Sequence, residues 1–446
     1  MSAPAPAAPM DASTVDRKDL LRVIVSAVLV ALPISLVAIG FLNLVDVPQT
    51  WVWQTAPADL GLDAAPWWWA VPWLVLAGLL VSLAIVLFPG RGGHVPANGT
   101  GGPPVPPGAV VGVFLAALAG LPLGVVLGPE APLIAMGTGL AVGISRLLRL
   151  SPGGRLEALI GIAGAAAAIS IIFGSPLTAV VFMAEAVAVA GGPVIAAIIP
   201  ALLGVGIGAL LFSGMGSNPG ITAQSLQLVK LDTVPAPDLG DLLWAVPVGV
   251  VAAVVMTVVF TVGQRVAARL GPLSRGRLVG ATMVVGLVVA GCASAYALIT
   301  GRSPFDVASS GTATLATITG DTAAWSSGAL VALLVFKALG YMLSLGAFRG
   351  GPIFPSILLG GAFGVLLAPL PGLGVAGGLA VGMAAFAAAG MKMPLSAVAL
   401  TCLMFGTNAT GVFPEVAVAA VVAYAARVAL DRRASASAAA PEPAPA

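Results

Sequence analysis

The stretch "VVLGPEAPLIAMGTG" at residues 125–139 places one carboxylate, Glu130, between two prolines in an otherwise apolar run. An ionisable side chain at membrane depth is costly, and it marks a functional residue by default. Proline lacks a backbone N–H and its ring clashes with the preceding helical turn, so this run predicts an interrupted segment. We therefore expect irregular backbone here that is buried in protein or lines a cavity.

The frame Gly-Pro-x-x-Pro occurs twice, as "GPEAP" at 128–132 and as "GPIFP" at 351–355. Each copy precedes an apolar, glycine-containing helix. The order continues downstream, where "SPLTAVVFMAE" (175–185) follows the first copy and "MPLSAVALTCL" (393–403) follows the second. Two matched pairs in the same order predict an internal repeat. An odd number of spans between the halves would give the second half the opposite orientation in the membrane. In such an inverted repeat, two broken-helix loops meet near the bilayer midplane.

The composition is that of an integral membrane protein. Of 446 residues, 59% are hydrophobic and only 8% are charged, whereas soluble domains contain about 25% charged residues. The mean hydropathy is +1.08. About fourteen apolar segments are recognisable, several of them shorter than the ~20 residues of a spanning helix.

Charge and residue counts exclude several classes of function. The net charge of +2 is too small to indicate a nucleic-acid partner. One histidine and two cysteines in apolar runs predict no metal site and no cofactor. No nucleophile, base and orienting group occur together, so we expect no catalytic residues and no enzyme activity.

We divide the chain into five parts. They are a disordered cytoplasmic leader (1–20), a first transmembrane half (21–215), an external loop (216–241), a second transmembrane half (242–430) and a disordered cytoplasmic tail (431–446). Basic clusters precede the first span, follow the fourth, fill the central loop and close the chain. The positive-inside rule then predicts a multi-pass protein with both termini in the cytoplasm.

The two Gly-Pro-x-x-Pro loops have the chemistry of an anion site. Each precedes a helix, so free N–H groups and the positive end of a helix dipole point toward the loop. Two facing helix N-termini bind an anion through partial charges, without a full cation that would hold it too tightly. The alternative is that glycine and proline only kink packed helices.

Glu130 is the candidate gate of this site. A carboxylate at a helix N-terminus is itself an anion, so it occupies the site when deprotonated and leaves it when protonated. The alternative is a structural role, in which Glu130 caps its own helix or pairs with a buried base such as Arg349 or Lys337.

With these motifs, the chain resembles the CLC family of chloride channels and proton-coupled anion exchangers. It is most similar to the divergent, short bacterial subgroup of ion-channel proteins. The family's "GREGP" loop corresponds to 128–132, its "GxFxP" loop to 351–355 and its "APLAGxLFxxE" helix to 175–185, and the resemblance covers residues 20–430. It implies an all-α polytopic inverted-repeat bundle with short, broken and re-entrant helices in the bacterial inner membrane. It further implies voltage-gated chloride channel activity, a homodimer with one pore per subunit, and Glu130 as gating residue.

The resemblance also assigns candidate ligands. Backbone groups of the two loops are the expected anion-binding positions: Gly128, Ala131, Gly351, Ile353 and Phe354. The family's intracellular "GSGIP" loop matches "GGHVP" at 92–96, which puts Gly93 in the place of a serine ligand. His94 is either a substitute N–H donor, which would titrate near neutral pH, or a surface residue.

Several positions depart from the family pattern. Pro129 and Pro352 have no N–H to offer the anion, and no residue matches the family's tyrosine ligand after the last helix. The family's pair of adjacent acids is here Glu185-Ala186, with alanine at the proton-transfer position. Glu185 is therefore the candidate for a proton path, or else a structural acid.

These observations predict an anion channel or transporter for chloride or another small inorganic anion, fluoride and other halides included. A proton-coupled antiporter is the first alternative, with protons as a second partner. A non-conducting membrane scaffold with a degenerate CLC fold is the second. In every case the lipid bilayer is a partner.

Overall fold

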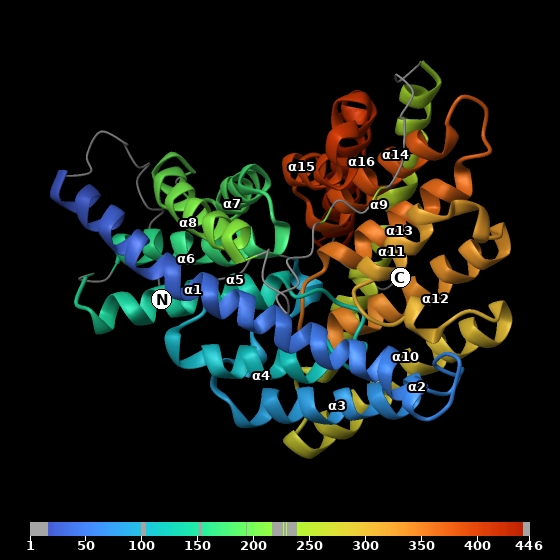
Figure 1. The fold of residues 1–446 in the computed structure, drawn as a ribbon, viewed down its shortest axis with the longest axis horizontal. Helices are drawn as coiled ribbons and strands as arrows, with labels where there is room; N and C mark the ends of the chain where they lie inside the picture. The colour runs from blue at the N-terminus through green and yellow to red at the C-terminus, as the bar shows by residue number, and fades with distance from the viewer. Residues whose placement is uncertain are drawn as a thin grey trace, which may run out of the picture.

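The computed structural model describes residues 17–99, 104–150, 154–192, 194–215, 226, 229 and 239–439. These residues form helices joined by turns, with no strand among them, which confirms the predicted all-α fold (Figure 1). Most of the predicted leader (1–16), most of the predicted external loop and the end of the predicted tail (440–446) lie outside the described residues.

The helices of the first half are α1 (Arg17–Thr50), α2 (Ala56–Asp59), α3 (Ala70–Leu87), α4 (Val110–Gly120), α5 (Glu130–Leu147), α6 (Arg155–Phe173), α7 (Pro176–Val189) and α8 (Val194–Met215). Those of the second half are α9 (Leu239–Leu270), α10 (Arg275–Thr300), α11 (Thr312–Gly320), α12 (Ser327–Ala347), α13 (Ile353–Leu367), α14 (Gly374–Met391), α15 (Pro394–Phe405) and α16 (Ala409–Ala439). Each predicted apolar segment corresponds to one of these helices, whereas the short α2 and α11 were not predicted. Helix α16 continues through residues 431–439, which we expected to be disordered.

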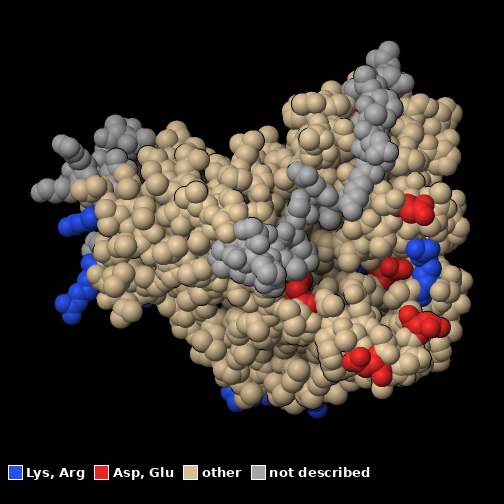
Figure 2. Space-filling view, viewed as in Figure 1, with Lys and Arg blue, Asp and Glu red and all other residues tan. Residues whose placement is uncertain are grey.

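Nine stretches of the described chain are long and apolar enough to cross a membrane, and α7 and α13 are shorter apolar helices. Large apolar side chains are exposed on several of these helices, for example Leu177 (75%), Leu210 (74%) and Leu243 (72%). Charged side chains are sparse on the face shown in Figure 2, where a broad area carries none. Because water does not favour such a surface, it fits contact with lipid.

The packing of the first half recurs in the second. Helix α5 packs on α6 as α13 packs on α14, and α6 packs on α8 as α14 packs on α16. Likewise, α1 contacts α6 and α8 in the way that α9 contacts α14 and α16. The repeat that the two sequence motifs predicted is therefore visible in the arrangement of the helices.

Matched glycines bring the first helix of each loop motif against its neighbour. A Cβ at Gly137 of α5 would lie 2.5 Å from the Gly164 carbonyl oxygen, and one at Gly360 of α13 would lie 2.2 Å from that of Gly382. Gly137 and Gly360 each lie seven residues after the first residue of their helix. Such small residues let transmembrane helices approach closely. Here they let α5 pack against α6 and α13 pack against α14.

Candidate functional site

The two Gly-Pro-x-x-Pro loops meet. Gly128 and Gly351 form an isolated antiparallel bridge, in which the Gly128 N–H donates to the Gly351 carbonyl (2.8 Å) and the Gly351 N–H donates to the Gly128 carbonyl (2.5 Å). Helix α5 begins two residues after Gly128, and α13 begins two residues after Gly351. The bridge therefore brings together the N-termini of two helices from different halves of the chain.

Glu130 binds the N-terminus of the opposite helix. Its side chain is fully buried, and its Oε1 accepts hydrogen bonds from the N–H groups of Ile353 (2.6 Å) and Phe354 (3.3 Å). These are the first two residues of α13, whose N-cap residue Pro352 makes no side-chain hydrogen bond to the helix. The carboxylate thus occupies the place where free N–H groups and the helix dipole favour an anion.

The other carboxylate oxygen of Glu130 is unusual. Its Oε2 is buried and has no hydrogen-bond partner among the residues that the structure describes. A buried polar atom without a partner raises the free energy of the state that contains it. Among the described residues, the carboxylate is consequently held through its Oε1 alone.

Gly128 and Gly351 make room for this carboxylate. A Cβ at Gly128 would lie 2.0 Å from Glu130 Oε2, and a Cβ at Gly351 would lie 2.3 Å from Glu130 Cδ. The two glycines were predicted as anion-binding positions, but their N–H groups are bonded to each other's carbonyls. They contribute space and the bridge, while Ile353 and Phe354 contribute the donors.

The two predicted bases do not pair with Glu130. The buried Lys337 ammonium donates to the backbone carbonyls of Ala308 (2.9 Å) and Ser309 (3.0 Å) in the segment before α11. Arg349 donates to the carbonyls of Arg91 (3.2 Å) and Phe348 (2.9 Å). The alternative of a buried ion pair at Glu130 is therefore wrong, because both cations are already solvated by peptide oxygens.

The "GGHVP" loop approaches the site through Arg349. Its preceding 3₁₀ turn, η3 (Pro89–Gly92), supplies the Arg91 carbonyl that Arg349 binds. Gly93 has a positive φ of 95° and is half-buried, as is His94. The hydrogen bonds at Glu130 involve neither Gly93 nor His94, and Ala131 lies next to Glu130 in the first turn of α5.

Glu185 also binds the N-terminus of a helix in the other half. Its Oε1 accepts from the Leu395 N–H (3.0 Å), and its Oε2 accepts from the N–H and the hydroxyl of Ser396 (both 2.6 Å). These residues open α15, whose N-cap residue Met393 makes no side-chain cap. The geometry favours the structural reading of Glu185 over the proton path.

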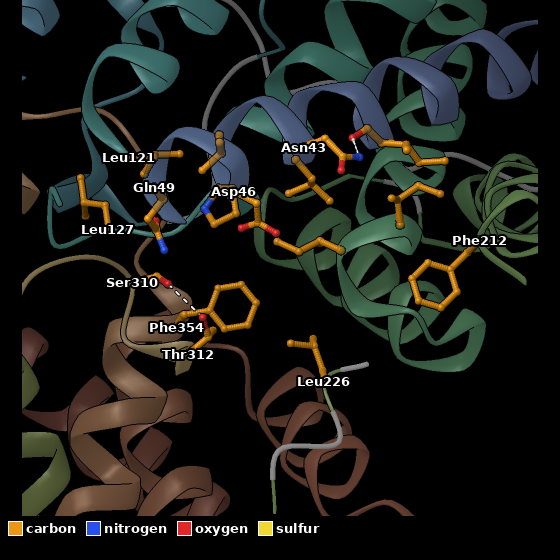
Figure 3. Close-up of a pocket in the computed structure, with 16 residues that line it drawn as sticks. Asn43, Asp46, Gln49, Leu121, Leu127, Phe212, Leu226, Ser310, Thr312 and Phe354 are labelled. Carbon is orange, nitrogen blue, oxygen red and sulfur yellow. Dashed lines mark hydrogen bonds between the residues drawn. The ribbon is translucent and has the colours of Figure 1, made fainter. Parts of the chain in front are cut away.

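A pocket lies between α1 and residues of both halves of the chain (Figure 3). The space between its lining residues is about 890 Å³, open solvent included, and the lining includes Pro129, which precedes Glu130, and Phe354, which donates to it. Asp46 and Gln49 project from α1 toward Ser310 in this view. The polar residues of α1 were missed in the sequence, although Asn43, Asp46 and Gln49 recur every three residues in an apolar helix, as one face requires.

Two further buried polar residues, Tyr341 and Ser356, were also missed. The Tyr341 hydroxyl lies 2.6 Å from the Pro352 carbonyl oxygen and 3.1 Å from Ser356 Oγ. The available signal was weak: a hydroxyl on each side of the second Gly-Pro-x-x-Pro loop, inside apolar segments. Nothing in the sequence showed that both turn toward the loop.

The chain is similar in sequence to known proteins. The model of a family described as "Voltage gated chloride channel" matches residues 95–427. Among curated proteins, "Putative ion-transport protein YfeO" of Escherichia fergusonii is 34% identical over 169 residues, and that of Salmonella paratyphi A is 34% identical over 170. Each alignment covers 38% of this chain and only 40% of the relative's length.

Solved structures show the same fold at low sequence identity. A slow cyanobacterial Cl⁻/H⁺ antiporter superposes with a TM-score of 0.75 at 19% identity, covering 92% of this chain and 95% of that one. A CLC-type fluoride/proton antiporter superposes with a TM-score of 0.70 at 17% identity, covering 93% of this chain and 97% of that one. The inverted-repeat helical bundle expected from the motifs is thereby confirmed.

Proposed function

The chain belongs to the voltage-gated chloride channel family, and from that premise we propose that it passes chloride or another small inorganic anion across the membrane. One observation supports the proposal above all: the Glu130 carboxylate lies on the N–H groups of Ile353 and Phe354, where the two halves meet. A group that holds a carboxylate through backbone donors at a helix N-terminus can hold a mobile anion through the same donors.

Glu130 acts as a protonatable gate in this proposal. When deprotonated, it competes with the anion for the N–H groups of α13. When protonated, it loses the charge that holds it there, and the side chain moves into the adjoining pocket beside Pro129 and Phe354. The anion then binds in the vacated place. The N–H of Ala131, in the first turn of α5, is a further donor toward that place.

Weak coordination distinguishes this site. The prolines at 129 and 352 remove two N–H donors, and Gly128 and Gly351 use theirs in the bridge. Gly93 and His94 would line the inner approach, which Arg349 ties to the second loop. A site with few donors suits rapid passage better than tight binding.

A proton-coupled anion antiporter is the second candidate. It is favoured by the two antiporters that share the fold and by a gate that takes up a proton whenever it opens. Glu185 would carry protons from the inside only by giving up its three bonds to α15.

We further propose a homodimer with one pore per subunit in the bacterial inner membrane, with both termini in the cytoplasm. The exposed apolar residues of α7 and α8, among them Leu177, Ile195 and Leu210, belong to the face expected to form the dimer.

The test is a flux assay in liposomes loaded with chloride, fluoride or nitrate, in which anion efflux and internal pH are followed together. Efflux without proton movement supports a channel, opposite proton flux in fixed ratio supports exchange, and no flux of any anion supports a non-conducting scaffold. Glu130→Gln and Glu130→Ala should both remove the pH dependence of flux. Glu157→Gln, which removes an acid paired with Arg146 at the surface, is the control and should keep it. An unchanged pH profile in both Glu130 variants would remove the gating role.

A further inference from the structure

Tyr341 of α12 is fully buried directly behind the second loop. Its hydroxyl donates to the Pro352 carbonyl oxygen at 2.6 Å. The Ser356 hydroxyl donates to the same oxygen at 2.8 Å, and the two hydroxyl oxygens are 3.1 Å apart. Two side-chain donors therefore converge on one carbonyl. That carbonyl belongs to the N-cap residue of α13, the helix whose N-terminus binds the Glu130 carboxylate.

That carbonyl belongs to the peptide unit that carries the main donor of the site. The bond between Pro352 and Ile353 joins the carbonyl bound by Tyr341 to the N–H bound by Glu130 at 2.6 Å. A trans peptide is planar, with its C=O and N–H pointing in opposite directions. A hydrogen bond that fixes the oxygen on one side therefore also aims the N–H on the other side.

The same bond increases the strength of the donor. Hydrogen bonds in series polarise one another, which strengthens each by about 10–30% in condensed phases. The chain Tyr341 hydroxyl, Pro352 carbonyl, Ile353 N–H and Glu130 carboxylate is such a series. It matters here because proline at 352 removes the preceding N–H, and the Phe354 N–H bond is longer, at 3.3 Å.

Packing holds the Tyr341 ring in this orientation. The ring meets Phe260 of α9 edge to face, with centroids 6.3 Å apart and planes at 86°. Edge-to-face pairs of this geometry are attractive and directional. Tyr341→Phe would keep this ring contact and lose only the hydroxyl, so its effect reports on the hydroxyl alone.

We infer that Tyr341 is a positioning residue, supported by Ser356, which orients and polarises the Pro352–Ile353 peptide so that its N–H binds the anion of the site. The anion is the Glu130 carboxylate when the gate is closed and the transported ion when it is open. The inference rests on the proposed function for the transported ion, but it applies to the carboxylate independently.

The chain permits a direct spectroscopic test. A Pro-Ile peptide occurs only at 33–34 and 352–353. Protein labelled with ¹³C′-proline and ¹⁵N-isoleucine, reconstituted in lipid, should therefore give two carbonyl–amide cross-peaks. In Tyr341→Phe, one cross-peak should move and the Pro33–Ile34 cross-peak should stay. Tyr296→Phe, which removes a buried hydroxyl bound to Asp306 instead, is the matched control and should move neither.

Anion affinity is measured in the Glu130→Ala background, where no carboxylate competes. Adding Tyr341→Phe should weaken anion binding by about 1.3- to 4.5-fold, as loss of about 10–30% of a charge-assisted hydrogen bond of about 1.5–3 kcal/mol implies. Ser356→Ala should act in the same direction with a smaller effect, and it decides the question if Tyr341→Phe does not fold.

The outcomes separate this inference from the proposed function. If no anion moves the Ile353 cross-peak and no flux occurs in the parent protein, the proposed function fails, while the response of the anion-free cross-peak to Tyr341→Phe still tests the inference. If anions bind and pass, but Tyr341→Phe and Ser356→Ala leave both the cross-peak and the affinity unchanged, the inference is overturned.

Discussion

Gly351→Ala should destroy the seat of the Glu130 carboxylate while sparing the backbone around it. Gly351 has no positive φ, so alanine can adopt its conformation and keep both hydrogen bonds of the bridge to Gly128. The new methyl carbon would lie 2.4 Å from Glu130 Oε2 and 2.7 Å from Oε1. Since non-bonded heavy atoms rest about 3.5–4.0 Å apart, the carboxylate must withdraw by about 1 Å.

The size of the effect follows from the bond that is lost. Glu130 Oε1 lies 2.6 Å from the Ile353 nitrogen, and withdrawal by about 1 Å takes it beyond hydrogen-bond distance. A hydrogen bond to a charged group contributes about 1.5–3 kcal/mol, so occupancy of the seat should fall by about 10- to 150-fold. A transported anion that uses the same N–H group meets the same methyl group, and its affinity should fall by at least about tenfold.

The assay combines calorimetric anion titration with liposome flux at several external pH values. Gly351→Ala and Glu130→Ala should both flatten the pH dependence of flux. Only Gly351→Ala should lower anion affinity, because its methyl group occupies the space beside the Ile353 N–H, whereas Glu130→Ala leaves that space free for an anion. Gly328→Ala on α12, where an added Cβ meets nothing within 4 Å, is the control. If Gly351→Ala keeps the parent's affinity and pH profile, the anion does not bind at the carboxylate seat and the reasoning is refuted.

Three further predictions concern residues away from the seat. Glu185→Ala should lower the free energy of unfolding by about 1–2 kcal/mol, as loss of a helix cap does, and should leave the ratio of transported anions to protons unchanged. Loss of proton flux at unchanged stability would instead make Glu185 a proton relay. Lys337→Met should leave the buried carbonyls before α11 without a donor. The free energy of unfolding should fall by about 2–4 kcal/mol, so thermal inactivation should be faster, and an unchanged inactivation rate would contradict this. Burial raises the pKa of Asp306 above its ordinary value, so the ionised form is disfavoured in the fold and stability should fall as pH rises from the ordinary pKa through the raised one. Asp306→Asn should remove this slope in unfolding midpoints measured from pH 4 to 8, and an identical slope in the variant would show that another group causes it.

The sequence predicts the helices well because membrane helices are set by local hydropathy. The short α2 and α11 escape that signal, since four and nine residues are too few to form an apolar run. The repeat was readable because its prolines and glycines punctuate the chain in the same order twice. The contacts that use these residues were not, because they join positions 223 residues apart, as between Glu130 and Ile353.

The roles of Gly128 and Gly351 show where the limit lies. Both were expected to donate N–H groups to an anion, on the reasoning that loops before helices have free donors. The structure pairs the two loops with each other, which uses those two donors and leaves the N–H groups of Ile353 and Phe354, which were also predicted, to bind the carboxylate. A bridge between two loops has no hydropathy signal, so only the fold reveals it.

The role of Glu185 could have been read from the repeat. Ser175 caps α7 through the Thr178 N–H, whereas its counterpart Met393 provides no side-chain cap for α15. A helix that lacks its own cap inside a membrane protein needs an acceptor from elsewhere. Aligning the two halves identifies the missing cap, and Glu185 is an acid of the matching segment.

Two of the glutamates of the first half, Glu130 and Glu185, therefore make the same kind of contact with different consequences. Each binds the N-terminus of a second-half helix whose own N-cap residue supplies no acceptor, Glu130 at α13 and Glu185 at α15. Both oxygens of Glu185 accept hydrogen bonds and its side chain is half-buried. Loss of one of these bonds would therefore only weaken the cap of α15. Glu130 is fully buried, with Oε2 unpartnered among the described residues. A charge held by one oxygen in an apolar site is the one that protonation or a competing anion can displace, and this difference in hydrogen bonding is why we propose Glu130, and not Glu185, as the gate.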